Sequence, residues 1–160
     1  MTFLNPTAHD ARHTVDDVLT AFDLLDFGRT AWKQTGVIRD ERTNSDLFLV
    51  TLEKSEREYS PSTLYKDYAI SPTLFHWESQ STTSQRSPTG QRYIHHRQRS
   101  GNILLFVRDR RKQDGRTMPY TLLGPVDYVS HKAERPITFV WKLRRPMPAD
   151  FFRRAKVASA

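Results

Sequence analysis

The sequence contains no cysteine and no long hydrophobic run, and each absence excludes a class of protein. A cysteine count of zero in 160 residues excludes disulfides, thiolate zinc sites and a cysteine nucleophile, and it fits a reducing compartment. The longest apolar stretches, such as Ile103 to Val107, are far too short to span a bilayer. The first residues also lack the basic-then-apolar order of a secretory signal peptide. We therefore expect a soluble, cytoplasmic protein without a membrane partner.

Glycine is scarce as well, and the six glycines form none of the loops that bind nucleotides. The chain has no Gly-x4-Gly-Lys-Ser/Thr loop and no Gly-x-Gly-x2-Gly fingerprint, so we do not expect it to bind ATP or a dinucleotide. A Gly-x-Ser-x-Gly nucleophile elbow is also absent. The histidines lack the spacing of a metal site, and hydrogen-bonded or phosphate-adjacent histidines are the simpler interpretation. We expect no cofactor and no metal.

What the sequence does contain is an uneven distribution of charge. Residues 1–80 hold 8 Lys and Arg against 13 Asp and Glu, whereas residues 81–160 hold 17 against 5, which gives the net charge of +7. Of the 17 cations in the second half, 13 are arginines, which suit phosphate recognition better than lysine does. A solvated basic face is the alternative, but this segregation favours a polyanionic partner, most simply nucleic acid.

Periodicity predicts a β-rich α+β domain. Thr14 to Gly28 has the capping residues and apolar spacing of a helix, and residues 1–40 form a helical lead-in to a β-rich module over 41–157. Pro148 opens a short basic C-terminal helix. Without βαβ alternation, a mostly antiparallel curled sheet or open barrel, with a helix at each end, is the expected fold of this single domain. About seven short strands are expected, over residues 46–54, 64–70, 73–77, 103–107, 120–123, 126–130 and 137–143.

The stretch from Tyr65 to Ile94 concentrates the rare residue types. It sets aromatic rings beside a Ser/Thr/Gln tract, which is the composition of a recognition site. Its polar part, Ser81 to Arg92, is expected to be an exposed loop. Trp77 adjoins this loop and is a candidate for stacking on a base, whereas Phe139 and Trp141 share one strand face and are expected in the core.

A metal-dependent nuclease site is the enzymatic alternative in the same stretch. Asp67, Glu78 and Gln80 approximate the pattern of a carboxylate followed by Glu-x-Lys, which holds a divalent ion beside a scissile phosphate. Gln80 stands where such sites usually have lysine. We therefore favour Glu78 as a hydrogen-bond acceptor in a recognition pocket.

Three long phrases of the sequence carry a family resemblance. They begin with YKDYAISPTLFHWESQSTTSQRSPTGQRYIHH, continue with ILLFVRDRRKQDGRTMPYTLLGPVDYVSH and end with ITFVWKLRRPMPADFF. Over about residues 40–155 the chain resembles an uncharacterised domain at the C-terminus of bacterial DEAD/DEAH-box helicases, which often also carry a phospholipase-D-like nuclease domain. The resemblance implies a role in restriction or phage defence. It transfers no catalytic residue, because the ATPase and nuclease motifs belong to the other domains.

Charge and composition together predict a non-catalytic module that binds DNA and recognises a base, a modification or a backbone feature. The alternatives are the small nuclease, with Asp67, Glu78 and Gln80, and a docking subunit for a separately encoded helicase or nuclease. The expected phosphate contacts are Arg86, Arg92, Arg97, Arg99, Arg110, Arg111 and Lys112. The expected base or modification contacts are Tyr68, His76, Trp77, Gln80 and Gln91.

Overall fold

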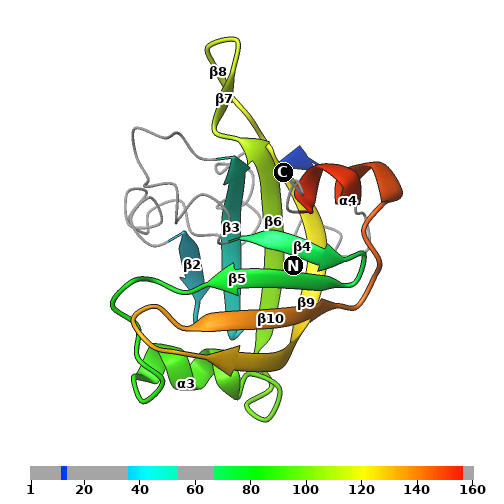
Figure 1. Cartoon of the computed structure of the whole chain (residues 1–160). Coiled ribbons are helices and arrows are strands. Elements are labelled where there is room, and N and C mark those ends of the chain that lie inside the picture. Colours follow the sequence, from blue (N-terminus) through cyan, green and yellow to red (C-terminus); the bar gives the residue numbers. More distant parts are fainter. Residues whose placement is uncertain (1–11, 14–35, 54–66, 157–160) are drawn as a thin grey trace.

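The computed structural model describes residues 12–13, 36–53 and 67–156 (Figure 1). The helix predicted from Thr14 lies outside these residues. In the described part, seven strands form one path of hydrogen-bonded neighbours in the order β2-β3-β6-β9-β10-β5-β4, and β1 (Arg12–His13) adds to β9. The strands of the path are β2 (Val37–Asp40), β3 (Ser45–Glu53), β4 (Tyr68–Ser71), β5 (Leu74–Glu78), β6 (Asn102–Arg110), β9 (Tyr120–Lys132) and β10 (Thr138–Leu143).

All neighbours in this sheet are antiparallel except β3 and β6, which run parallel. The described elements outside the sheet are the hairpin of β7 (Lys112–Gln113) and β8 (Arg116–Thr117), helix α3 (Pro88–Ile94) and helix α4 (Ala149–Ala155). The predicted α+β class, with mostly antiparallel strands, is confirmed. No helix in the described ranges is both long and apolar enough to cross a membrane.

The sheet is strongly curled, which two aromatic rings demonstrate. Three strands separate β3 from β5 in the sheet order, yet the rings of Phe48 and Trp77 stack with their centroids 4.0 Å apart. Only a sheet bent around its own side chains brings these strands together, because neighbouring strands lie about 4.8 Å apart in a flat sheet. The described strands do not close into a barrel, since β2 and β4 end the path.

Alternation along the strands selects the residues of this core. Phe139 and Trp141 of β10 are fully buried on the concave side, as the sequence predicted, and their rings stack at 4.9 Å. Strand β3 is buried from Ser45 to Val50, so both of its faces are covered over this range. Leu104 and Val140 are only half-buried, because they alternate with the concave-side residues.

The structure corrects the predicted break at Gly124-Pro125. Residues 120–132 form one long strand, β9, rather than two. The pairing with β6 shifts between Leu105, opposite Gly124, and Phe106, opposite Leu122, which is a β-bulge. A bulge bends a strand without ending it, so one strand pairs with β6 in its first half and with β10 in its second half.

The polar stretch Ser81 to Arg92 is not a continuous exposed loop as predicted, because helix α3 begins at Pro88. The hydroxyl of Ser87 caps this helix by accepting the backbone N–H of Gly90 at 3.0 Å, and Pro88 occupies the first turn. Gly90 is buried against the preceding loop. The strand β2 was not predicted, whereas the basic C-terminal helix appears as α4 after Pro148.

Candidate nucleic-acid interface

The aromatic part of the Tyr65–Ile94 stretch belongs largely to the core. Trp77 is 4% exposed, and besides Phe48 its indole contacts the ring of Tyr93 edge-on at 5.5 Å. A ring enclosed in this way cannot stack on a base without opening the core, so the expectation for Trp77 is corrected. Strand β5 alternates Phe75 and Trp77 inward with His76 outward, and this period of two decides their roles.

Tyr68 and His76 are the two aromatic candidates that remain at the surface. They form a cross-strand pair between β4 and β5, and their rings stack with centroids 4.5 Å apart. Both side chains are half-buried, on the face of the sheet opposite to Trp77. Each of the two rings therefore already has one of its faces covered by the other ring.

The two glutamines proposed to contact bases instead hold the loop before α3. The amide of Gln80 donates to the Tyr93 hydroxyl at 3.1 Å, and its oxygen accepts the hydroxyl of Thr83 at 3.3 Å. The amide of Gln91 donates to the backbone carbonyl of Gln85 at 2.7 Å. These hydrogen bonds satisfy polar groups that the folded loop partly buries.

The same contacts weaken the nuclease hypothesis. A carboxylate oxygen of Asp67 accepts the backbone N–H of Glu78 at 3.0 Å, while the amide of Gln80 is bonded to Tyr93. Among residues 36–53 and 67–156, no three histidine, aspartate or glutamate side chains are grouped so that they could hold a metal ion. The arrangement of Asp67, Glu78 and Gln80 therefore lends that hypothesis no support.

Arg92 has a structural partner that the sequence did not reveal. Its guanidinium donates two hydrogen bonds to the carboxylate of Asp46, Nε at 2.8 Å and Nη2 at 2.9 Å, and Arg39 adds a third at 3.2 Å. The Asp46 side chain is 2% exposed, and the ion pair joins α3 to β3. Burial alone would lower the pKa of Arg92. The hydrogen bonding to Asp46 and the negative charge of that carboxylate outweigh this effect, so the pKa of Arg92 is raised. We therefore assign Arg92 to the scaffold rather than to phosphate binding.

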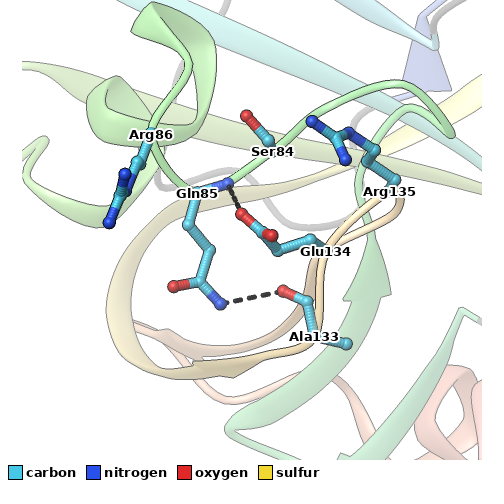
Figure 2. Close-up of a pocket in the computed structure, with 6 residues that line it drawn as sticks. All are labelled: Ser84, Gln85, Arg86, Ala133, Glu134 and Arg135. Atoms are coloured by element: carbon cyan, nitrogen blue, oxygen red, sulfur yellow. Dashed lines mark hydrogen bonds between the residues drawn. The ribbon is translucent and has the colours of Figure 1, made fainter.

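Three other predicted phosphate contacts surround the end of the molecule that carries α3. Arg97 and Arg99 are exposed, and Arg97 lies 3.9 Å from Asp127. Arg86 lines an open depression of about 730 Å³ together with residues 84–85 and 133–135. Figure 2 shows Arg86 and Arg135 on opposite sides of this depression, with Glu134 between them accepting the backbone N–H of Gln85 at 2.8 Å. The two guanidinium groups do not converge on one point, so the depression is a poor anion site.

The remaining predicted phosphate contacts lie together on a basic hairpin, by which we mean residues 110–117. This hairpin extends β6 and projects past the end of the sheet (Figure 1). All eight residues are exposed, and they comprise four cations, Arg110, Arg111, Lys112 and Arg116, and one acid, Asp114. Asp114 (φ 52°) and Gly115 (φ 76°) both have the positive φ of a type I′ turn, for which Asp-Gly is a preferred dipeptide.

A buried arginine anchors the base of the basic hairpin. Arg108 is 7% exposed, and its guanidinium lies over the ring of Tyr120 at 4.4 Å. It donates to the hydroxyl of Thr51 at 2.9 Å and to the carbonyl of Met118 at 3.2 Å. Burial, with a smaller contribution from the charge of Arg111, lowers the pKa of Arg108. These bonds fix both ends of the hairpin to the sheet.

Helix α4 places further cations at the same end of the molecule (Figure 1). Arg154 donates to the carboxylate of Asp109 at 3.1 Å, which ties α4 to β6 one residue before the basic hairpin. Arg153 and Lys156 of this region are exposed. The predicted phosphate contacts did not include Arg116, Arg153 or Lys156. Arg116 could have been included, because it directly follows the Asp-Gly turn and lies close in the sequence to the other hairpin cations.

Comparison with known families places the chain without giving it an activity. Residues 9–155 match the model of a family described as a domain of unknown function, DUF3427. A search of the curated proteins gives no match. The function must therefore be argued from the residues themselves.

Proposed function

Because the chain belongs to the DUF3427 family, whose description assigns no activity, we propose from its own geometry that it is a non-catalytic DNA-binding module. Its main contact is the basic hairpin, and the exposed cations of α4 extend that contact. Association follows from the attraction of closely spaced guanidinium and ammonium groups for the phosphates of the nucleic-acid backbone.

The basic hairpin is the single observation that carries this proposal. Four cations and one acid within eight exposed residues concentrate positive charge on a projecting element that a polyanion can approach. Folding gains little from such a segment, because it buries almost no apolar surface. A binding role accounts for the concentration of charge better than a stabilising role does.

The proposal is tested by measuring affinity for a labelled DNA fragment as a function of salt concentration. If the hairpin cations Arg110, Arg111 and Lys112 contact phosphates, log K should fall with log salt at a slope of about −2.7, from about −0.9 per contact, and Arg116 and α4 would steepen the slope. The double variant Arg110→Ala with Arg111→Ala should reduce the slope by about 1.8. A matched control is Lys132→Ala with Lys142→Ala, which removes two exposed cations outside the hairpin and α4.

Two results would contradict the proposal. One is a salt slope near zero for the wild-type protein. The other is an equal loss of affinity in the hairpin variant and in the lysine control, because a diffuse positive charge would then explain binding. Thermal unfolding of all variants shows whether each remains folded, which we expect because the four substituted side chains are exposed.

The same protein distinguishes binding from cleavage. When it is incubated with supercoiled plasmid and Mg²⁺ or Mn²⁺, the protein should bind the plasmid without nicking it. Nicking that disappears in Asp67→Asn would instead support the metal-dependent nuclease.

The cellular context stays a proposal of its own. The resemblance described above is the observation that favours a helicase-associated role in restriction or phage defence, either as a terminal domain or as a docking subunit. In that setting the module would hold DNA beside an ATP-driven partner, or detect a feature of the DNA for it. Co-purification with a helicase encoded beside it would support this role, and a module that binds DNA but no such helicase would argue against it.

A further inference from the structure

We infer that the basic hairpin enters the major groove of duplex DNA, where Gln113 and Arg116 contact base edges. The inference rests on the proposed function and deepens it, because it assigns the form of nucleic acid, the groove and the residues that confer sequence preference. It differs from the expectation drawn from the sequence, which placed the base contacts in the Tyr65–Ile94 stretch.

The shape of the hairpin is that of a narrow two-stranded ribbon. Lys112 pairs with Thr117 and Gln113 pairs with Arg116, on either side of the two-residue turn. The type I′ turn matches the right-handed twist of the strands, so that they stay paired up to the tip. Two strands about 4.8 Å apart fit a major groove about 12 Å wide, which admits a β-ribbon, whereas the minor groove of about 6 Å is too narrow.

The pairing divides the side chains between the two faces of the ribbon. Cross-strand partners lie on the same face, and successive residues alternate between faces, so Gln113 and Arg116 share one face while Lys112 and Thr117 share the other. Glutamine can bond the N6 and N7 positions of adenine, and arginine the O6 and N7 positions of guanine. The two residues nearest the turn on one face are thus the two side chains best suited to direct contact with purines.

The composition of the hairpin argues against other forms of nucleic acid. Residues 110–117 contain no aromatic side chain. Proteins that hold single strands rely on aromatic rings on which the bases stack. Duplex RNA has a deep and narrow major groove that side chains do not reach. B-form DNA is the duplex whose major groove accepts this ribbon.

The test begins by selecting preferred sites from a pool of duplexes with a randomised centre. The wild-type protein should enrich a motif with an A·T pair for Gln113 and a G·C pair for Arg116 at fixed positions, and Gln113→Ala should reduce the preference for that motif over a scrambled duplex by about 10-fold or more. The salt slope should stay unchanged in this variant, because no charge is lost. Thr117→Ala, on the opposite face of the ribbon, is the matched control and should keep the preference.

Two further measurements identify the groove and the strand state. Methylation of guanine N7, which lies in the major groove, should interfere with binding at the selected site. Unlabelled single-stranded DNA and duplex RNA should compete less well than duplex DNA of the same sequence.

The outcomes separate this inference from the proposed function. If DNA is bound through the hairpin cations but no motif is enriched, or Gln113→Ala and Thr117→Ala behave alike, the groove contact is wrong and the DNA-binding module stands. Competition by a minor-groove ligand without N7 interference would also overturn it. If no DNA is bound at all, the proposed function itself fails.

Discussion

Replacing Trp77 gives the sharpest test of where the core ends and where the binding surface begins. The indole is 4% exposed and stacks on Phe48, a residue of a strand that is remote in the sheet order. Trp77→Ala should therefore remove an anchor between the two halves of the curled sheet. Deleting a buried aromatic side chain costs about 3–5 kcal/mol, and loss of the stacked geometry adds about 0.5–1.5 kcal/mol.

A double-mutant cycle separates the loss in free energy of unfolding into a contribution from burial and a contribution from ring stacking. Phe48→Ala, Trp77→Ala and the double variant should show a coupling of about 1 kcal/mol, because each single substitution already removes the ring contact. Urea unfolding followed by circular dichroism measures these free energies without depending on tryptophan fluorescence. Trp77→Phe should cost about half as much as Trp77→Ala, since it keeps a ring that can stack on Phe48.

DNA binding by Trp77→Phe completes this test. The folded variant should bind DNA with wild-type affinity, salt slope and sequence preference, because Trp77 is absent from the basic hairpin. The reasoning is refuted if Trp77→Ala lowers the free energy of unfolding by less than about 1 kcal/mol. It is refuted equally if Trp77→Phe remains stable but loses sequence preference, since the indole would then contact DNA.

Four further outcomes follow from the described contacts. Asp46→Asn should cost about 3 kcal/mol in urea unfolding, because it leaves the partly buried Arg92 without a full counter-charge. Burial lowers the pKa of His96 below its ordinary value of 6.5, so the stability it contributes is complete above pH 6.5 and is lost as the pH falls. Urea midpoints at pH 5 and pH 7 should show this loss, and His96→Gln should diminish it. Gly90→Ala should lower the melting temperature, because the new Cβ would clash with the backbone oxygen of Ser84. Gly115→Ala should strain the hairpin turn by about 1 kcal/mol, which lowers the melting temperature by only about 2–4 °C, and it should weaken DNA binding.

Much of the sheet could be predicted because its strands carry strong local patterns. Strands β3, β5, β6 and β10 combine short apolar runs with β-branched or aromatic residues, and the turns at Pro72 and Asp114 have the residue types that turns require. Helix α3 was hidden because it is only seven residues long and begins in a polar tract, where its cap at Ser87 resembles loop composition. Gly124-Pro125 resembled a break because the sequence does not distinguish a bulge from a turn.

The candidate site was harder to predict because the role of each residue depends on contacts with residues that are distant in the sequence. The alternation of Phe75 and Trp77 along β5 could have placed Trp77 in the core, but its polar neighbours His76 and Glu78 obscured that pattern. Nothing near Arg92 in the sequence indicates that Asp46, 46 positions away, is its partner. The Asp-Gly dipeptide by itself indicates the turn of the basic hairpin, whereas assigning the other arginines required the fold.

The charged side chains of the chain have different surroundings in the folded structure. Of the five acids in residues 81–160, Asp127 pairs with Arg144 at 2.9 Å and Asp109 pairs with Arg154 at 3.1 Å, each joining different parts of the sheet or its covering helix. Asp46 in the acidic half binds Arg92. Asp114, the one acid in the basic hairpin, occupies a turn position with positive φ, for which aspartate is suited by its conformation. Asp109, Asp114 and Asp127 therefore serve packing and turn geometry, and the projecting ribbon has a net charge of +3, from four cations and one acid. A net charge summed over the sequence cannot make this distinction, because it counts a partly buried arginine such as Arg92 and an exposed arginine alike.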